Sequence, residues 1–302
     1  MERWPASRAN RSRARWLTAA AVTLAMIGVP FAAVPAGAAV TLGQLPAAPP
    51  PASSDCSSAD FLQPSIIGGN LYIARQAGTI TSWSTLASGT SAGAAYVFKV
   101  FRRTTDPDIF QVIARAPERT LTAGLNTAPV NIAVRSGDMI GFHVDGLSSS
   151  CTFPQLGDAV LRRPGALPDG ASGQFTPLND VRLNLSAVLA PSNAFTIASI
   201  TRDRRKGTAT VTVNVSNSGV AAISGKGLRK RRATRNVAVA GTVQFQIAAA
   251  GSQKRRLQKT GKVRLTTTLT FTPTGGDPAA ATFAVKLKRK RSVRRSRIPS
   301  PS

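Results

Sequence analysis

The chain has few of the residues on which enzymes and metalloproteins depend. Its 302 residues include one histidine, two cysteines and two tyrosines, and Glu118 is the only glutamate after the second residue. A lone histidine with no Ser or Cys nucleophile motif beside it supplies no catalytic constellation. Two cysteines without neighbouring histidines do not make a zinc shell. These shortages disfavour an enzyme and predict no metal site and no cofactor.

The single histidine, His143, lies in the alternating segment IGFHVDG. We expect a strand histidine on one face of a sheet, and the alternative is a catalytic base flanked by Asp138 and Asp145. These two carboxylates, and Asp106 and Asp108 in TDPD, are also candidate calcium ligands. A calcium site takes six or more oxygens, and no repeated carboxylate loop occurs. Turn-forming roles beside Pro and Gly are therefore expected for them.

Long apolar runs are scarce, and the one that stands out comes at the N-terminus. Five arginines precede residues 17–40, which carry no charge and include the small-residue segment PAGA, ending at Ala38. A positive flank, an apolar run and a small-residue site predict a signal peptide over residues 1–38, cut after Ala38. The alternative is an uncleaved anchor, for which the Gly and Pro residues of the run are unfavourable. We expect a secreted or cell-surface protein with no stable transmembrane anchor after cleavage.

The two cysteines, Cys56 and Cys151, fit an exported chain. An even number of cysteines in an oxidising compartment predicts a disulfide. A bond between them would close a loop of roughly a hundred residues, which the loop-entropy account values at about 4 kcal/mol.

Sustained helical periodicity is also lacking, whereas short β-rich segments are frequent. After a Pro/Ala/Ser-rich segment at 39–58, candidate strands such as NLYIA, TITSWSTL, AYVFKVFR, FQVIAR, VNIAV, MIGFHV and VRLNLSAVL are separated by turn clusters such as TDPD and PDGASG. Many short strands between turns predict an antiparallel sandwich, jelly-roll-like or Ig-like. The expected plan is a signal peptide at 1–38, a flexible linker at 39–58, a disulfide-bonded sandwich at 59–190, a basic Ig-like sandwich at 191–288 and a disordered basic tail at 289–302.

Alternation sharpens after the boundary at Pro191-Ser192-Asn193. In TATVTVNV, VRLTTTLTF and FAVKLK the apolar residues recur at every second position, which is typical of a half-buried antiparallel sheet. The segment VAVAGTVQFQI keeps the same phase, although Gly241 is a point at which it can divide into two strands. The segment SQKRRLQKTG is expected to form one short helical turn.

Negative charge is scarce in the last third of the chain. The total net charge is +26; residues 41–190 carry ten basic and ten acidic residues, whereas residues 191–302 carry 24 basic and two acidic ones. Such asymmetry indicates a polyanion or membrane partner, or a solvated charged surface. The basic residues form clusters between the expected strands. The candidate polyanion-binding residues are Arg204, Arg205, Lys206, Lys226, Arg229, Lys230, Arg231, Arg232, Arg235, Lys254, Arg255, Arg256 and Lys259.

Several of these segments resemble the sequences of a known group of proteins. The stretches KGTATVTVNV, ISGKGLRKRR, VAVAGTVQFQI, RRLQKTGKVRLTTTLTFTPTGGDP and FAVKLKRK resemble a basic Ig-like repeat of uncharacterised exported bacterial proteins. The preceding unit, through FLQ, GTITSWS and RSGDMIGFHV, is similar to the β-sandwich that stands before such repeats. The resemblance covers about residues 56–291. It implies a surface or extracellular β-rich protein and assigns no catalytic residues.

The function expected from these patterns is non-enzymatic attachment to acidic envelope polymers or other polyanions, by electrostatics and without sequence-specific reading of nucleic acid. One alternative is a carbohydrate-binding or adhesion module in residues 59–190, with the basic domain as a spacer. Its candidate platform residues are Trp83, Tyr72 and Tyr96, although their apolar strand contexts favour the core. The other alternative is a hydrolase with Asp residues around His143.

Overall fold

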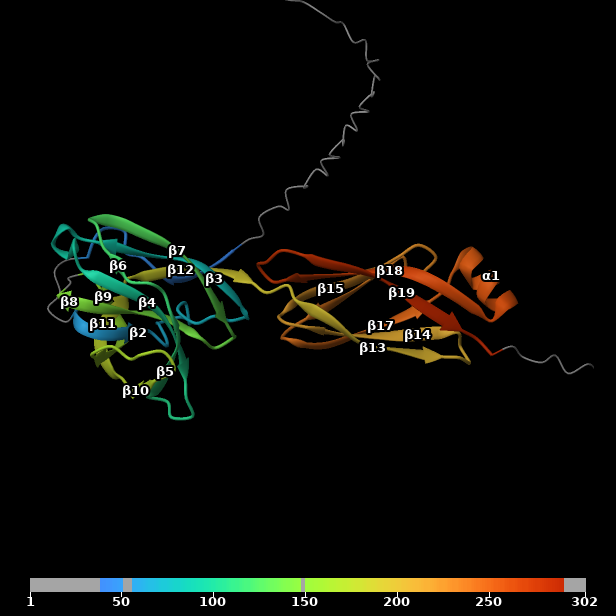
Figure 1. The fold of residues 1–302 in the computed structure, drawn as a ribbon, viewed down its shortest axis with the longest axis horizontal. Coiled ribbons are helices and arrows are strands. Elements are labelled where there is room, and N and C mark those ends of the chain that lie inside the picture. Colours follow the sequence, from blue (N-terminus) through green and yellow to red (C-terminus); the bar gives the residue numbers. More distant parts are fainter. Residues whose placement is uncertain (1–38, 51–55, 148–149, 291–302) are drawn as a thin grey trace, which may run out of the picture. The chain divides into compact units, whose positions relative to one another are not determined.

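The protein is built almost entirely of antiparallel β-sheet, as predicted. A computed structural model describes residues 39–50, 56–147 and 150–290, and its strands form four sheets (Figure 1). The expected signal peptide at 1–38 and residues 291–302 of the expected tail lie outside the described residues. Within the described ranges, no helix is both long and apolar enough to cross a bilayer.

Two sheets form the N-terminal sandwich. The smaller has the order β1-β12-β3-β7 and the larger the order β10-β5-β4-β8-β2-β9-β11, with β6 paired to β4. The smaller sheet comprises β1 (Val40–Gln44), β3 (Gly78–Ala87), β7 (Gly124–Val134) and β12 (Leu185–Pro191). The larger comprises β2 (Ser57–Leu62), β4 (Ala95–Arg103), β5 (Ile109–Arg115), β6 (Arg119–Thr120), β8 (Met139–Leu147), β9 (Thr152–Pro164), β10 (Ser172–Gln174) and β11 (Thr176–Leu183); a 3₁₀ turn, η1, spans Gly89–Ser91.

The larger sheet has a buried core on each of its faces. On β4, Tyr96 and Phe98 point into the main core between the two sheets, where Phe98 stacks on Trp83 with ring centroids 5.9 Å apart. The intervening positions face the other way, so that Phe101 enters a smaller core with Phe175. A strand that buries both faces needs no strict apolar-polar alternation. This explains why AYVFKVFR has apolar residues on both faces, with Lys99 as the one charged residue before Arg102.

The predicted disulfide is confirmed. Cys56 lies directly before β2 and Cys151 directly before β9, and their sulfurs are bonded. Both residues are buried in the main core.

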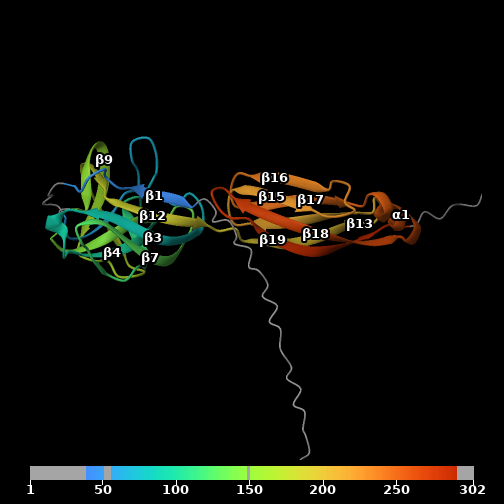
Figure 2. The same cartoon turned by 90° about the horizontal axis from the view of Figure 1, so that it is seen from above.

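Two further sheets form the C-terminal sandwich. One has the order β13-β14-β17 and the other the order β16-β15-β18-β19. The first comprises β13 (Phe195–Asp203), β14 (Thr208–Val215) and β17 (Gly241–Ala248), and the second comprises β15 (Gly219–Ser224), β16 (Arg232–Val237), β18 (Lys262–Pro273) and β19 (Ala279–Lys288). The helix α1 (Gly251–Thr260) connects β17 to β18 and lies at one end of this sandwich in both views (Figures 1 and 2).

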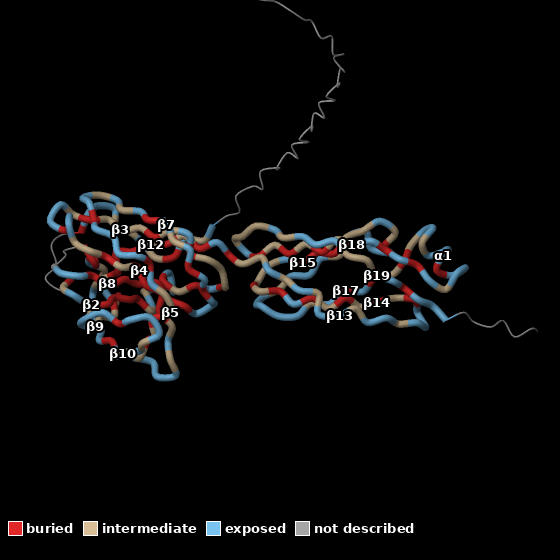
Figure 3. Tube along the Cα trace, viewed as in Figure 1, coloured by how far each residue is buried: buried red, intermediate tan, exposed pale blue. Residues whose placement is uncertain are grey.

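The alternation predicted for TATVTVNV and VRLTTTLTF is confirmed, whereas Val239 of VAVAGTVQFQI lies between two strands and is 71% exposed. On β14, Val211 and Val213 are fully buried, and on β18 Leu269 and Phe271 are fully buried as well. Gly241 divides the segment VAVAGTVQFQI as expected, because β16 ends at Val237 and β17 begins at Gly241. Figure 3 shows the buried residues of these strands in red along the inside of the sandwich.

Several expectations were wrong. Residues 40–44 of the expected flexible linker form β1, which pairs with β12. The segment NLYIA forms no strand and makes only an isolated bridge from Ile73 to Met139. The SQKRRLQKTG segment forms a ten-residue helix rather than one turn. It ends at Thr260, and the next residue, Gly261, adopts the left-handed conformation (φ 73°) that glycine favours at a helix C-terminus.

Removing the disulfide should destabilise the N-terminal sandwich. The Cys56→Ala, Cys151→Ala double variant frees a chain closed over a separation of 95 residues, and the expected loss in unfolding free energy is about 4 kcal/mol. Urea unfolding followed by tryptophan fluorescence measures it, since Trp83 is the one tryptophan after residue 38. Reduced wild-type protein is the control and should match the variant. An unchanged midpoint in both would contradict a stabilising disulfide.

Candidate functional site

The basic clusters of the C-terminal sandwich come together at one end of it. The turn 204–207 joins β13 to β14, the loop 225–231 joins β15 to β16, α1 joins β17 to β18, and residues 286–290 close β19. We call these four segments the basic end. All of their Lys and Arg side chains are exposed.

Main-chain hydrogen bonds fasten the 225–231 loop to the segment that leads into α1. The N–H of Arg229 donates to the carbonyl oxygen of Ala248 (2.7 Å), and the N–H of Ala250 donates to the carbonyl oxygen of Gly227 (2.8 Å). Leu228 is buried in the core of this sandwich and anchors the loop from the other side. The backbone of the loop is therefore held in one conformation, and its basic side chains extend from it into solvent.

The end of β19 is tied to the other two segments in the same way. The N–H of Arg289 donates to the carbonyl oxygen of Gly261 (2.8 Å), directly after α1. The N–H of Lys290 donates to the carbonyl oxygen of Arg204 (2.9 Å) in the turn. The expected disorder is therefore wrong for residues 289 and 290, which belong to the basic end.

One cavity takes a basic residue from each of the four segments. It measures about 480 Å³, and Lys206, Arg229, Lys254 and Arg289 all contribute to its wall. Ala250 and Gly251 line it too, so that the N-terminus of α1 opens onto it. The N-cap residue makes no side-chain cap, and the first turn holds no acidic residue. Helix N-termini carry partial positive charge and unpaired N–H groups, which favour anions.

A second hollow of about 440 Å³ lies between α1 and the paired ends of β18 and β19. Five cationic residues line it: Arg256, Lys262, Arg264, Lys286 and Lys288. The opposite end of the sandwich has a different character, because its connecting segments 216–218, 238–240 and 274–278 contain Asp277 and no Lys or Arg. The positive charge is therefore concentrated at one end rather than spread over the surface.

The predicted binding residues fall into three groups. Most lie at the basic end, on the turn, the loop or α1: Arg204, Arg205, Lys206, Lys226, Arg229, Lys230, Arg231, Lys254, Arg255, Arg256 and Lys259. Arg232 begins β16 beside the loop. Arg235 lies farther along β16, opposite Ala221, and is not part of the basic end. Arg289 was missed as a site residue because the sequence gives no sign that β19 ends against α1.

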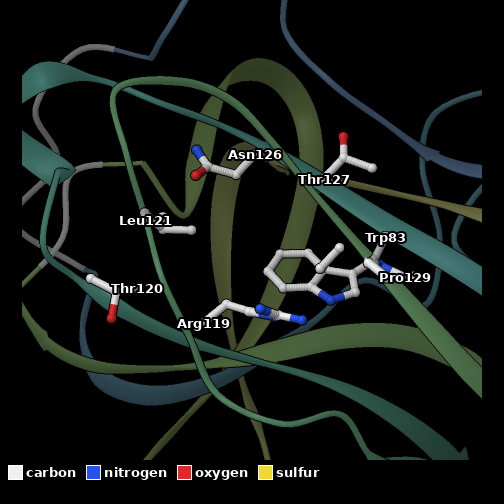
Figure 4. Close-up of a pocket in the computed structure, with 8 residues that line it drawn as sticks. Trp83, Arg119, Thr120, Leu121, Asn126, Thr127 and Pro129 are labelled. Atoms are coloured by element: carbon white, nitrogen blue, oxygen red, sulfur yellow. The ribbon is translucent and has the colours of Figure 1, made fainter.

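A second candidate site lies in the N-terminal sandwich, between β3, β6 and β7 (Figure 4). Its volume is about 220 Å³, and Trp83, Arg119, Thr120, Leu121 and Thr127 are among the lining residues. The indole N–H of Trp83 is buried and has no hydrogen-bond partner. A buried donor is normally paired, so this nitrogen marks the pocket as a place for a polar group.

The core role favoured for the three aromatic residues is confirmed, and the alternative of an exposed platform is wrong. Trp83, Tyr72 and Tyr96 are all at most 1% exposed and belong to the main core. The Tyr72 hydroxyl donates to the main-chain carbonyl of Leu183, and burial raises the pKa of Tyr72. Of the three, Trp83 also lines the pocket between β3, β6 and β7.

Two of the candidate metal ligands, Asp138 and Asp106, have structural partners. Asp138 holds the Arg102 guanidinium through both oxygens, at 2.7 and 2.9 Å. Asp106 accepts the N–H of Asp108 in the expected turn. Among the residues that the structure describes, no group of three or more His, Cys, Asp or Glu side chains is placed to hold a metal ion.

Comparisons with known proteins add no family. No family model and no curated protein matches the sequence. Solved structures with partial likeness include the glycoside hydrolase domain of Endo-D from Streptococcus pneumoniae (11% identity, TM-score 0.22), a β-glucuronidase from Ruminococcus gnavus (9%, 0.21) and a β-1,2-glucanase from Parabacteroides distasonis (12%, 0.18). The alignments cover 68%, 68% and 78% of this chain but only 28%, 36% and 31% of those proteins. Likeness at this level carries no functional argument.

Asp203, the last residue of β13, directly precedes the turn 204–207 of the basic end and organises it. Its side chain accepts the N–H groups of Lys206 (3.0 Å) and Arg205 (2.9 Å). The bond from Lys206 has the largest effect and lowers the pKa of Asp203; desolvation opposes it, and the bond from Arg205 and the charges of both side chains lower the pKa further. Because the folded pKa is depressed, the carboxylate stabilises the turn above its unfolded pKa, and this stabilisation is lost as the pH falls through the folded value.

We therefore expect the Asp203 carboxyl, followed by NMR, to titrate below the usual midpoint of about 3.9. The control is a peptide of residues 200–210, in which the turn is not held and the midpoint should be ordinary. A midpoint in the protein equal to that of the peptide would show that the two N–H bonds do not form.

Proposed function

We propose that this protein is an exported surface or extracellular protein that attaches to acidic envelope polymers through its basic end. The observation that carries this proposal is the cavity to which Lys206, Arg229, Lys254 and Arg289 each contribute from a different segment. If the basic residues served solubility alone, those of separate segments would not need to gather around one cavity. The convergence provides several cations within reach of one multiply charged chain.

The charge balance of the C-terminal sandwich supports an external partner. Residues 191–302 contain two carboxylates, Asp203 and Asp277, against 24 Lys and Arg residues. Like charges held at one end of a small domain repel one another and lower its stability, which a bound polyanion would offset. Binding would be driven mainly by release of counterions, and it would weaken as salt is added.

The aromatic residues of this sandwich argue for backbone attachment rather than base reading. Residues 191–302 contain no Trp or Tyr, and Phe245 and Phe271 are fully buried. Phe195 and Phe283 pack against the same core. A single-strand binder normally offers aromatic faces on which bases stack. We therefore propose acidic wall polymers as the partner in preference to nucleic acid.

Export rests on two features of the chain. The N-terminal charge and hydropathy pattern is typical of a secretory signal peptide, and a buried disulfide is typical of an oxidising compartment. The strand order β13-β14-β17 against β16-β15-β18-β19 further supports the Ig-like assignment, since seven antiparallel strands divided between two sheets are the common plan of such domains. We propose that this domain is an Ig-like module of a cell-surface protein.

Binding to isolated cell walls across a salt series tests the proposal. The variant Lys206→Gln, Arg229→Gln, Lys254→Gln, Arg289→Gln should bind much more weakly than wild type, whereas walls stripped of anionic polymers should bind neither. With single-stranded DNA as a polyanion of known charge spacing, losing four contacts should flatten the slope of log affinity against log salt by about 3.

The matched control removes four exposed arginines from the N-terminal sandwich, namely Arg75, Arg103, Arg115 and Arg135. This variant changes the total charge by the same amount and should keep wild-type binding and slope. Equal losses in both quadruple variants would show that only net charge matters. Undiminished binding by the basic-end variant would sink the proposed site.

The pocket beside Trp83 supports a second candidate function, the binding of a small polar ligand such as a neutral sugar. Such pockets combine an apolar wall with a few placed polar groups. Here Leu121 and Ala128 supply apolar surface, and the unpaired Trp83 indole N–H supplies a buried donor. Arg119 and Thr120 bring further polar groups to the same pocket.

A panel of neutral oligosaccharides, monitored by Trp83 fluorescence, tests this candidate. Binding should be insensitive to salt and should weaken roughly tenfold in Arg119→Ala, the effect of losing a hydrogen bond to a charged group. Arg135→Ala, on the neighbouring 135–138 turn and outside the pocket, is the control. A fluorescence change that persists unaltered in Arg119→Ala would exclude this pocket as its source.

A further inference from the structure

Three polar side chains meet inside the N-terminal sandwich, away from both candidate sites. The Lys99 ammonium lies 2.6 Å from Oδ1 of Asp60, and Nδ1 of His143 lies 3.0 Å from the same oxygen. The other oxygen, Oδ2, accepts the N–H of Leu167 (2.8 Å), and Lys99 Nζ also donates to the Leu167 carbonyl (2.9 Å). The cluster joins three neighbouring strands, β2, β4 and β8, to the loop that precedes β10.

The cluster is isolated from water on almost every side. Asp60 is fully buried, Lys99 is 1% exposed and His143 is 9% exposed. These residues share their face of the sheet with the smaller core, which includes Leu62 and Phe101. Figure 3 shows the inner part of this sandwich, where β4 and β8 run, as largely buried. The histidine has most of the cluster's contact with solvent, so it provides the main route by which a proton or a water molecule can leave.

The choice of lysine at this position is informative. Lys99 is the only lysine before Lys206 in the sequence, and every other basic residue up to that point is arginine. The other shielded ion pairs of this sandwich, Arg102 with Asp138 and Arg182 with Asp158, follow that rule. A buried ion pair is usually better served by the fork of arginine, which is more weakly hydrated and can grip both carboxylate oxygens. A lysine differs in having an amine that becomes a nucleophile once it loses its proton.

We propose that Lys99 and Asp60 condense to form an intramolecular isopeptide bond, with His143 as the proton-transfer catalyst. The site is then a self-modification site that crosslinks β4 to β2 across the intervening strand β8. It is independent of the polyanion attachment proposed above.

The step balances without an oxidant or a cofactor. A proton passes from the Lys99 ammonium to the Asp60 carboxylate, which leaves a neutral amine and a carboxylic acid. The amine lone pair attacks Cγ of Asp60, and the C–N bond forms while negative charge develops on Oδ2. Protonated His143 then gives its proton to Oδ1, which departs as water when the C–Oδ1 bond breaks. The surplus proton on the new amide nitrogen returns to His143.

The contacts are divided between the two oxygens in the way this step requires. Oδ1, which leaves, is the oxygen that faces both the nucleophile and the histidine. Oδ2, which stays, is held by the N–H of Leu167, a donor placed where the charge develops. The product keeps an N–H near the Leu167 carbonyl and a C=O near the Leu167 N–H. Both hydrogen-bonding groups of the amide therefore retain partners.

Burial and proximity supply the driving force. Two opposite charges held away from water carry a desolvation penalty, which is relieved when they are replaced by one neutral, hydrogen-bonded amide. Groups fixed in reacting geometry attain effective concentrations of about 10⁵–10⁸ M. Exclusion of water also disfavours the reverse reaction, which is hydrolysis of the amide.

Mass spectrometry of the reduced, denatured protein tests the proposal. With its N-terminus established by sequencing, the wild-type chain should be lighter than its sequence mass by one water molecule. Trypsin should fail to cleave after Lys99 and should release one branched peptide that joins the segments containing Lys99 and Asp60. A full sequence mass, with normal cleavage after Lys99, would overturn the proposal.

Two variants separate this bond from other causes of the same mass loss. Dehydration at the Asp145-Gly146 or Asp169-Gly170 pairs also removes one water, but it would persist in Lys99→Met, whereas the isopeptide would not. His143→Gln leaves both reacting groups in place and should raise the uncrosslinked fraction at least tenfold, with folding checked by circular dichroism. Complete crosslinking in folded His143→Gln would overturn the role given to the histidine.

Discussion

The basic end exists because main-chain hydrogen bonds hold together segments whose side chains repel one another. The turn 204–207, the loop 225–231, α1 and the end of β19 are fastened by N–H to carbonyl bonds between 2.7 and 2.9 Å. Such bonds do not depend on the charge of the side chains and are little affected by salt. The backbone can therefore keep cations close together while the side chains remain exposed and available. The cavity and the proposed attachment both follow from this division of roles.

The two sandwiches manage charge in opposite ways. In the N-terminal sandwich basic and acidic residues are equal in number over residues 41–190, and Asp60, Asp138 and Asp158 each hold a cation within a shielded site. The C-terminal sandwich buries aliphatic and phenylalanine side chains and leaves its cations outside. The N-terminal sandwich uses its ionic groups in internal ion pairs, whereas the C-terminal sandwich exposes them to solvent. This contrast coincides with the abrupt change in composition at the boundary between the two sandwiches.

Much of the fold was predictable, because alternation is a local signal. The strands TATVTVNV and VRLTTTLTF, the break at Gly241 and the disulfide could all be read from short stretches. The strand predicted for NLYIA is not formed, because its apolar residues enter the core from turns and an isolated bridge. The convergence of the clusters depends on which strands are neighbours, and the meeting of Asp60, Lys99 and His143 depends on register across three strands. Neither the order of the strands nor their register can be predicted from any single segment of the sequence.

The outer strands of the four-stranded C-terminal sheet both carry basic side chains. Arg232 and Arg235 belong to β16 at one edge, and Lys286 and Lys288 belong to β19 at the other. Unpaired strand edges invite pairing between copies, and charged side chains at those edges oppose it. Many copies gathered on one acidic polymer would be crowded at high local concentration, which is the condition that favours edge-to-edge assembly. The same charges that would draw the copies to the polymer would then keep their sheets from joining into fibrils.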